Sequence, residues 1–345
     1  MKILYLYVTA RRNKERQWQE GAGPDTLLYG LTNLRKMGHT VDYFDDAFES
    51  TNVWRLIFWP VARIIYQLTG YGFKLDQAVT LLPKYSDYDV LVACGNSAGL
   101  PLGLLKLLRL INKPIVCLHM GGAEKVTSGL MNWLYRQLYQ MIDKIIFFSD
   151  SERTFIRKEF GLEENRTVFC PLGIDTDFFK PVSKPGKYFL SVGRDRGRNF
   201  SKLLTSFSGG GFPLVLVSSA RNLKGLAISE NIKVFLDVSY LKLRELYIEA
   251  EAVLLPLVWT YRASGQLVLL ESLAMNKPVL ASECPGLLSG YDGLRKFVTI
   301  TDNFAECRSK KYNKSKINAA ELISKKYSSA ELAKRLEEIY EEVKD

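Results

Sequence analysis

Short apolar runs recur along this chain, and stretches with helical periodicity separate them. Six runs in the first half lie at residues 3–8, 41–44, 89–94, 114–119, 144–148 and 167–170. Six more lie at residues 188–192, 213–218, 232–236, 252–257, 278–282 and 297–300. Strands that alternate with helices form parallel sheets with helices on both faces. Two such series predict an α/β protein with two parallel sheets and therefore two domains.

The segment between the two series has the composition of an exposed linker. Residues 181–187 hold two prolines, a glycine and two lysines, which suit neither a helix nor a strand. We therefore predict one domain over residues 1–182 and a second over residues 183–326. Residues 327–345 begin near two serines and repeat apolar residues on one helical face, which predicts an amphipathic C-terminal helix.

Composition narrows the class of protein. The 345 residues are 47% hydrophobic and 24% charged, which excludes a disordered chain and is enough for two cores. The net charge of +10 predicts a surface that attracts phosphates, acidic substrates or anionic lipid head groups, without choosing among them. The five cysteines are scattered and several lie in apolar runs, which predicts buried thiols in a reducing compartment. With no signal peptide and no long apolar run, we expect a cytoplasmic protein.

Loops that follow strands carry the candidate binding residues, because ligands of open parallel sheets bind at the carboxyl ends of the strands. Gly21 and Gly23 end the loop after the first strand, before a predicted helix, where a phosphate could approach backbone N–H groups. An ordinary turn explains these two glycines equally well. The first loop of the second half carries Arg194, Arg196 and Arg198, which could clamp a diphosphate or form a solvated basic loop.

The segment 254–282 is the most informative part of the sequence. It combines a buried strand, a polar loop and a helix that begins near Gly265, with Glu271 about two turns into the helix. A carboxylate there can accept two hydrogen bonds from a ribose diol, while the N–H groups from Ser264 to Gln266 face a phosphate. Glu271 could instead be a surface residue, but its neighbours are mostly apolar, and an unpaired charge among them would be unfavourable.

These segments resemble the retaining nucleotide-sugar glycosyltransferases of family four, which have the GT-B fold. The resemblance extends, in the family's order, over residues 21–38, 169–181, 191–204, 238–247 and 264–282 and the C-terminal helix. It implies two Rossmann-like domains whose parallel sheets face a central cleft, and a C-terminal helix that crosses back to the first domain. It also implies transfer of a sugar from a nucleoside diphosphate to a hydroxyl group, with retention of the anomeric configuration. We expect the acceptor to be lipid-linked or polysaccharide-related.

The same resemblance implies roles for individual residues. The implied catalytic residues are His119, Arg194, Arg198 and Glu271, and the implied donor-binding residues are Gly21, Gly23, Val238, Ser264, Gly265 and Gln266. Arg194 and Arg198 would bind the diphosphate. Glu271 would bind the ribose, and the Val238 backbone the base. His119 ends the fourth apolar run, where a histidine of the family often contacts the sugar or its phosphate; a histidine satisfied within its own loop is the alternative.

Ala263 keeps other functions open. The family commonly has a glutamate at this position, which touches the transferred sugar, so the chain could be a catalytically weak or inactive relative that binds a nucleotide-sugar. A sugar-nucleotide epimerase of the same fold is another alternative. A nucleic-acid-binding module is disfavoured, because the basic residues are dispersed and no recognition motif is present.

No metal or other cofactor is predicted. Asp45, Asp46, Asp175 and Asp177 invite a metal site, but neither pair has a third ligand nearby in the sequence. The resemblance implies instead that arginine or lysine side chains and helix dipoles neutralise the leaving diphosphate.

Residues 54–70 predict contact with an anionic membrane surface. The apolar residues that share one helical face are Trp54, Ile57, Phe58, Val61, Ile65 and Leu68. Arg63 lies opposite, a pattern that suits a helix at a lipid interface. Residues 130–141, with Trp133, Arg136 and Tyr139, could add a second contact. We therefore expect a peripheral protein on the inner face of the cell membrane, although core helices are the alternative and Pro60 would kink the first.

Overall fold

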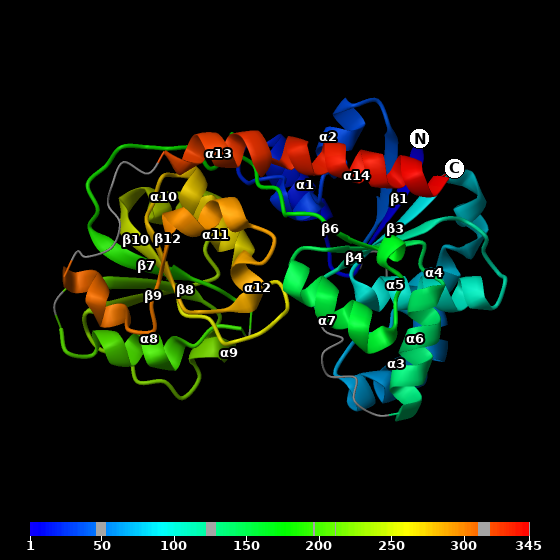
Figure 1. Cartoon of the computed structure of the whole chain (residues 1–345), viewed down its shortest axis with the longest axis horizontal. Coiled ribbons are helices and arrows are strands. Elements are labelled where there is room, and N and C mark those ends of the chain that lie inside the picture. The colour runs from blue at the N-terminus through cyan, green and yellow to red at the C-terminus, as the bar shows by residue number, and fades with distance from the viewer. Residues whose placement is uncertain (46–52, 122–128, 196, 211, 310–317, 345) are drawn as a thin grey trace. The chain divides into compact units, whose positions relative to one another are not determined.

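The computed structural model describes residues 1–45, 53–121, 129–195, 197–210, 212–309 and 318–344, and it divides into two compact units (Figure 1). Unit 1 comprises Met1–Glu15, Leu27–Pro171 and Leu332–Asp345, and unit 2 comprises Arg16–Thr26 and Leu172–Glu331. The residues predicted to be a linker, 181–187, form neither helix nor strand and belong to unit 2. The domain boundaries after residues 182 and 326 stay predictions.

Unit 1 is built on a six-stranded parallel sheet. In spatial order its strands are β2 (Thr40–Phe44), β1 (Lys2–Tyr7), β3 (Val90–Cys94), β4 (Ile115–His119), β5 (Lys144–Phe147) and β6 (Thr167–Phe169). Its helices are α2 (Leu31–Lys36), α3 (Val53–Thr69), α4 (Leu75–Thr80), α5 (Asn96–Leu107), α6 (Gly129–Gln140) and α7 (Asp150–Phe160). β3 and β4 are buried at every position, as expected for continuous apolar strands that helices cover on both faces.

Alternate residues of β1 point into two different layers of unit 1. Leu4 and Leu6 join the core formed with α4, α5, α6 and α7. Tyr5 points to the opposite layer, where its hydroxyl lies 2.9 Å from the hydroxyl of Tyr340 in α14 (Ser329–Lys344), and both side chains are buried. The C-terminal helix therefore covers one face of this sheet.

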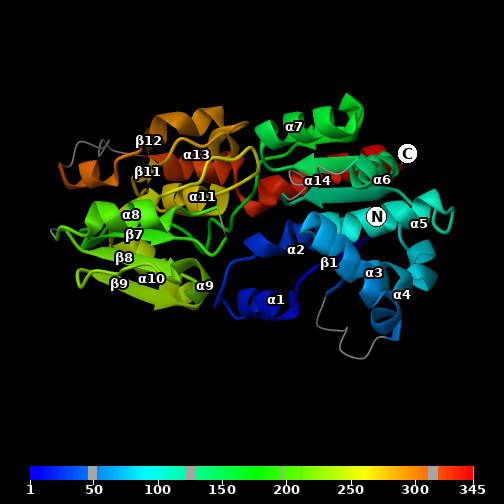
Figure 2. The same ribbon diagram turned by 90° about the horizontal axis from the view of Figure 1, so that it is seen from below.

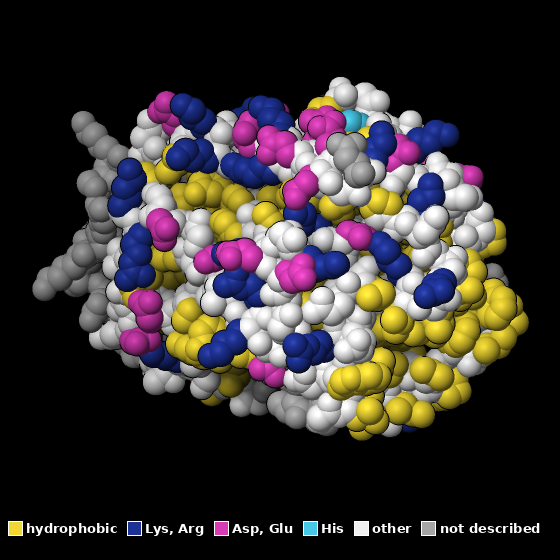
Figure 3. Space-filling model, turned by 45° about the vertical axis from the view of Figure 1, so that its right-hand side comes forward, with side chains coloured by type: hydrophobic (Ala, Val, Ile, Leu, Met, Phe, Trp, Pro, Cys, Tyr) yellow, Lys and Arg dark blue, Asp and Glu magenta, His cyan; other side chains and the backbone are white. Residues whose placement is uncertain are grey.

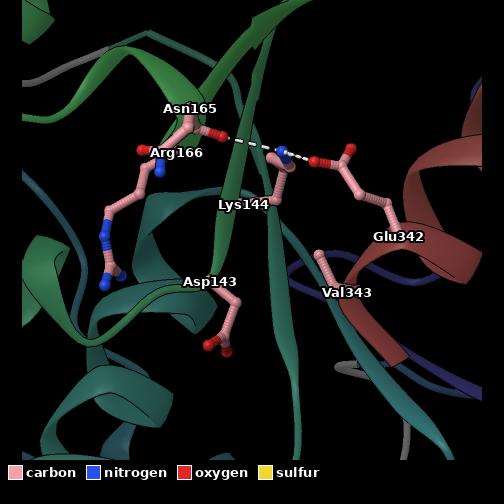
Figure 4. Close-up of a pocket in the computed structure, with 6 residues that line it drawn as sticks. All are labelled: Asp143, Lys144, Asn165, Arg166, Glu342 and Val343. Carbon is pink, nitrogen blue, oxygen red and sulfur yellow. Dashed lines mark hydrogen bonds and ion pairs between the residues drawn. The ribbon is translucent and has the colours of Figure 1, made fainter. Parts of the chain in front are cut away.

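The last turn of α14 is also tied to the sheet. Lys144, at the start of β5, forms an ion pair with Glu342 and donates a hydrogen bond to the main-chain oxygen of Asn165 at 2.7 Å. Figure 4 shows the Lys144 side chain between these two groups, beside a hollow that is also lined by Asp143, Arg166 and Val343. The C-terminal part of α14 is thus held to the sheet by specific polar groups at Tyr340 and Glu342.

Unit 2 contains the second six-stranded parallel sheet. In spatial order its strands are β12 (Val298–Ile300), β11 (Val279–Ala281), β10 (Ala250–Leu255), β7 (Tyr188–Val192), β8 (Leu214–Ser218) and β9 (Ile232–Leu236), and Figure 2 shows the last three side by side. Its helices are α8 (Phe200–Phe207), α9 (Ala220–Leu223), α10 (Tyr240–Glu249), α11 (Gln266–Ala274), α12 (Pro285–Leu288) and α13 (Ala319–Lys326). Counted from β7, the strand order is 3-2-1-4-5-6, the order of doubly wound nucleotide-binding sheets.

The remaining elements are short or contain residues of both units. α1 (Arg12–Gln19) begins in unit 1 and ends in unit 2, and α14 does the reverse. Short 3-10 helices lie at Thr26–Leu28, Leu82–Asp87, Glu164–Arg166, Asp292–Phe297 and Phe304–Ser309. Two parallel sheets flanked by helices confirm the predicted α/β class.

Candidate functional site

Two loops of unit 2 meet where the order of the strands reverses. β7 and β10 are neighbours, and the chain continues from β7 to β8 on one side and from β10 to β11 on the other. Ligands of such sheets bind outside the carboxyl ends of the strands at this switch point. Main-chain hydrogen bonds join the two loops, from Asn199 N to Pro256 O at 2.7 Å and from Val258 N to Gly197 O at 2.9 Å. The loops therefore form one connected edge.

Arg198 places a buried positive charge at this edge. Its side chain is only 3% exposed and lies 3.2 Å from the carboxylate of Asp195, which is itself 44% exposed. The guanidinium also donates hydrogen bonds to Val192 O at 3.3 Å and to Ser264 Oγ at 3.4 Å. Burial lowers the pKa of Arg198 below its usual value, and the Asp195 carboxylate partly offsets that effect. A buried cation of this kind favours a further anionic partner.

The amino terminus of α11 reaches the same place. Gly265 is the N-cap residue and has a φ of 88°, a left-handed conformation that glycine adopts without strain. A Cβ atom there would also lie 3.1 Å from the Leu287 side chain, so the helix begins in a tightly packed corner. Ser264 and Gln266 are buried, and the Gln266 side chain donates to the main-chain oxygen of Gly286. The first N–H groups of a helix have no partner within the helix, and those of α11 lie next to the Arg198 contact with Ser264.

Glu271 lies inside unit 2 rather than on its surface. It is 7% exposed, and its Oε2 atom accepts a hydrogen bond from the Tyr247 hydroxyl at 2.8 Å. Burial raises the pKa of Glu271 to about 7, although the hydrogen bond from Tyr247 acts in the opposite direction. The surface alternative for Glu271 is therefore excluded, and the carboxylate changes its charge near neutral pH.

Arg194 lies at the exposed rim of the same edge. Its guanidinium pairs with Asp237, which directly precedes Val238 in the turn between β9 and α10. Ser239 begins α10 as its N-cap, and its hydroxyl accepts a hydrogen bond from Lys242 N at 3.2 Å. The Arg194 contact thus joins the loop after β7 to the turn in which the base-binding backbone was predicted.

Arg262 and two aromatic residues of this edge were not singled out from the sequence. A Cβ atom on Gly197 would lie 2.7 Å from Ser264 Oγ and 3.1 Å from the Arg262 guanidinium, so Arg262 shares the space around Arg198. Trp259 and Tyr261 form an edge-to-face pair with ring centres 4.7 Å apart, and Trp259 is 58% exposed. The signal in the sequence was their place in the loop after a buried strand.

The glycine loop of the first half is shaped differently from the prediction. No helix begins directly after Gly23; a 3-10 turn covers Thr26–Leu28 and α2 begins at Leu31. Asp25 holds the segment, because its main-chain N–H donates to Asp175 and its carboxylate accepts from the Ser329 hydroxyl. A Cβ atom on Gly23 would lie 3.0 Å from the Tyr240 ring, while Gly21 has open space and a φ of 68°. Gly23 therefore packs closely on the start of α10.

His119 is enclosed within unit 1. The ring is fully buried at the end of β4, with Nδ1 3.1 Å from a carboxylate oxygen of Glu152. The amide nitrogen of Asn96 lies 3.0 Å from Nε2, and the Tyr139 hydroxyl lies 3.3 Å from the same atom. Nε2 thus has partners within unit 1, as the alternative of a satisfied histidine expects, whereas Nδ1 makes no hydrogen bond within the described part of the chain. Its contact with a sugar stays a prediction.

The acidic pairs of the sequence have other partners or lie outside the described residues. Asp175 accepts hydrogen bonds from Asp177 N at 3.1 Å and Phe178 N at 2.9 Å and so stabilises a turn. Asp45 accepts from Arg11 N, whereas Asp46 and Arg196 lie outside the described residues. Within the part of the chain that the structure describes, no group of three or more His, Cys, Asp or Glu side chains could hold a metal ion.

Comparison with known proteins shows what this chain is similar to, over part of its sequence and over its whole fold. Residues 27–178 match the model of Glycosyltransferase Family 4. Three solved structures, each 14% identical in sequence, cover 99% of the chain: sucrose-phosphate synthase from Thermosynechococcus elongatus, a glycosyltransferase from Rickettsia africae and Anabaena HepE in complex with UDP-glucose. Their TM-scores are 0.72, 0.68 and 0.69, and the matches cover 99%, 98% and 100% of those chains.

These similarities differ in what they support. They confirm the predicted GT-B fold, and the family match confirms the predicted glycosyltransferase class over residues 27–178. A shorter match, 29% identical over 123 residues, relates the chain to a helicase/deoxyribonuclease subunit of Listeria welshimeri. It covers 35% of this chain and 10% of that protein, too little for an argument about activity.

Proposed function

We propose that this chain, a glycosyltransferase of the GT-B fold, takes its sugar from a nucleoside diphosphate that binds at the switch point of unit 2. The observation that carries the proposal is the buried guanidinium of Arg198 beside the amino terminus of α11. A diphosphate offers the anionic oxygens that such a pair of groups favours. HepE, which shares this fold, was solved with UDP-glucose, which supports the same class of donor.

The other donor contacts follow from this placement. Arg194 would add a second cation at the diphosphate, and the main chain of Val238 would hydrogen-bond the base. Glu271, when ionised, would accept hydrogen bonds from the ribose hydroxyls. The backbone N–H groups of Ser264, Gly265 and Gln266 would hold the phosphate and the sugar. Gly21 and Gly23 would let the donor approach the backbone.

The proposed reaction breaks one bond and forms one. The bond between the anomeric carbon and the diphosphate oxygen breaks, and a bond from that carbon to the acceptor hydroxyl oxygen forms on the same face, with retention. The hydroxyl proton passes to the departing phosphate oxygen. Arg194, Arg198 and the α11 dipole would stabilise the charge that develops on the diphosphate, so the reaction would need no metal ion. The proposed acceptor is lipid-linked or polysaccharide-related.

A second candidate is a relative that binds the nucleotide-sugar but transfers it slowly or not at all. Ala263 favours it, because alanine cannot make the polar contact of the family's glutamate with the sugar. Both candidates share donor binding and differ in turnover. Slow hydrolysis of the donor would support the enzyme, and a sugar isomerised without an acceptor would indicate an epimerase.

Donor binding is tested by the thermal shift of the protein with nucleoside diphosphates and their sugars. A ligand at about 100 times its dissociation constant adds about 2.7 kcal/mol of stability. The Arg198→Ala variant should lose about 1.5–3 kcal/mol of binding free energy, because it removes a charge-assisted contact. Arg295→Ala is the matched control, since Arg295 is an exposed arginine of unit 2 whose ion pair with Glu283 is 3.8 Å long.

For each variant, the quantity compared is the thermal shift that the nucleotide causes. A substitution that changes the stability of the protein without nucleotide therefore does not affect the comparison. If Arg198→Ala responds to nucleotide as strongly as Arg295→Ala does, the diphosphate is not bound at this edge. If no nucleoside diphosphate shifts the wild-type protein, the proposed donor class is wrong.

A further inference from the structure

Helix α3 is exposed along nearly its whole length. Of its residues only Thr69 is buried, and Phe58, Ala62 and Ile65 are half-buried. These four positions are spaced by three or four residues and therefore lie on one side of the helix. Phe58 and Ile65 pack against the core of unit 1. The helix thus uses one narrow stripe to pack, and the rest of its circumference faces outward.

The outward side of α3 is apolar. Its exposed large apolar residues are Val53, Trp54, Leu56, Ile57, Trp59, Val61, Ile64, Tyr66 and Leu68. Leu56 is 79% exposed, although such side chains are usually buried in a core. This differs from the face predicted from the sequence, because Phe58 and Ile65 turn inward.

Helix α6 adds to this surface. Its Tyr135 hydroxyl donates to the Thr69 hydroxyl at the end of α3, at 3.3 Å. Leu130 and Trp133, near the start of α6, are 72% and 58% exposed, whereas Leu138 and Tyr139 are core residues. Figure 3 shows hydrophobic side chains gathered over a broad area at its lower right, on the unit that contains α3. We call the exposed residues of α3 together with Leu130 and Trp133 the apolar face.

The charges of α3 indicate which kind of partner suits the apolar face. The helix contains Arg55 and Arg63 and no acidic residue. The Arg63 guanidinium lies over the Trp59 ring, 5.0 Å from its centre, and these two residues line a surface hollow together with Ala62, Tyr66 and Gln67. Arginine beside tryptophan and tyrosine matches the head-group level of a bilayer, where phosphates meet aromatic rings.

A second copy of this chain is a poorer partner. A two-fold dimer brings the same face of both copies together, so arginines would meet arginines with no carboxylate on α3 to pair them. An anionic bilayer provides both an apolar interior and negative charge. No helix among the described residues is both long and apolar enough to cross a bilayer, so α3 would lie in the interface.

We propose that the apolar face docks unit 1 on anionic phospholipid, with Trp59 and Leu56 entering the interface and Arg63 contacting head-group phosphates. The inference deepens the proposed function, on which it rests for the lipid-linked class of acceptor. Lipid binding itself requires no donor, so the two proposals can fail separately.

Co-sedimentation with vesicles tests this surface in the full-length protein. Vesicles of phosphatidylcholine and of an equal mixture with phosphatidylglycerol are compared at low and at high salt. We expect binding to the mixed vesicles at low salt and weaker binding at high salt, because ions screen the arginines. Three of the five tryptophans, Trp54, Trp59 and Trp133, lie on the face, so brominated phosphatidylcholine in the mixed vesicles should quench the tryptophan fluorescence.

Substitutions locate the binding surface. Leu56→Glu and Ile64→Glu should each weaken binding roughly tenfold, because each removes an apolar side chain and adds a negative charge. Ile228→Glu is the matched control, since Ile228 is an exposed apolar residue of unit 2. Arg63→Gln should weaken binding to the mixed vesicles roughly fivefold and change binding to pure phosphatidylcholine little.

The outcomes separate lipid from other partners and from the donor site. Absence of wild-type binding to mixed vesicles at low salt would overturn the inference, and so would equal losses in Leu56→Glu and Ile228→Glu. A dimer that Leu56→Glu dissociates, without vesicle binding by the wild type, would assign the face to a second copy. The thermal shift with nucleotide should be the same in Leu56→Glu and in the wild type. If nucleotide does not shift the wild type, the proposed donor site is wrong, and the proposed membrane contact is unaffected.

Discussion

The buried carboxylate of Glu271 should make the stability of the protein depend on pH in an unusual direction. Burial raises the pKa of this group from 4.5 to about 7 in the folded protein. A raised pKa means that the folded state favours the protonated acid, so the stabilisation is complete below about pH 4.5 and is lost as the pH rises through about 7. One pKa unit corresponds to about 1.4 kcal/mol, so the total is about 3 kcal/mol.

Urea unfolding between about pH 4.5 and pH 8 measures this contribution. Glu271→Gln keeps the shape of the protonated acid and cannot ionise, so its free energy of unfolding should lack this fall with pH. Glu245→Gln is the control, because Glu245 lies on α10, is exposed and pairs with Lys242. Tyr247→Phe should move the fall to higher pH, since the Tyr247 hydroxyl group lowers the pKa of Glu271.

Nucleotide binding should show the opposite dependence on pH. Ribose hydroxyls donate hydrogen bonds, and only the ionised carboxylate offers both oxygens to accept them. Binding should therefore strengthen as the pH rises through about 7 and release a proton, which calorimetry in buffers of different ionisation enthalpy detects. If the unfolding profiles of Glu271→Gln and Glu245→Gln run parallel, Glu271 does not titrate as a buried acid. If nucleotide affinity is independent of pH, the ribose contact is wrong.

Two further predictions concern the metal and the packing of unit 1. Sugar transfer should survive EDTA, because arginines take the place of a cation at the diphosphate; lost activity that magnesium or manganese restores would contradict this. Gly103→Ala should lower the free energy of unfolding by about 1–3 kcal/mol, since a Cβ atom on this residue of α5 would lie 2.6 Å from the Leu138 carbonyl oxygen in α6. Gly209→Ala, with open space around it, is the control, and equal stability of the two variants in urea would mean that the helices are not so close.

The strands could be predicted well because each is an apolar run; central strands such as β3 and β4 are buried at every position, whereas β2 and β9 at the sheet edges keep exposed positions. Each of the twelve predicted strands lies at a strand of the structure, with ends displaced by two residues at most. The order of the strands could not be predicted from these runs. It depends on which edges the connecting helices reach, and the reversal between β7 and β10 appears only in the folded sheet.

Some residues of the candidate site could also be predicted from their positions along the chain. Arg198 and Ser264 lie in loops that precede helices at one edge of a parallel sheet, and Glu271 lies within the helix that follows Ser264, so their positions in the sequence were informative. The partners of these residues could not be predicted from the sequence, because the hydrogen bond from Tyr247 and the approach of Arg262 depend on side-chain directions.

Helix α3 shows another limit of pattern analysis. It is apolar around almost its whole circumference, so the sequence alone could not select the side that packs. The side of α3 that is buried, from Phe58 to Thr69, is determined by the core of unit 1 against which it packs.

The position of α14 has a consequence for how the protein is made. The ribosome releases the amino-terminal strands first, but the helix that covers Tyr5 follows unit 2 in the sequence. Until α14 has been synthesised, one face of the first sheet lacks Tyr340 and the ion pair of Lys144 with Glu342. A nascent chain therefore cannot complete unit 1 before unit 2 has been synthesised, whereas most domains fold in the order of their synthesis. During that interval the uncovered apolar sheet is a surface that chaperones would recognise, and a truncation that removes α14 would leave it exposed permanently.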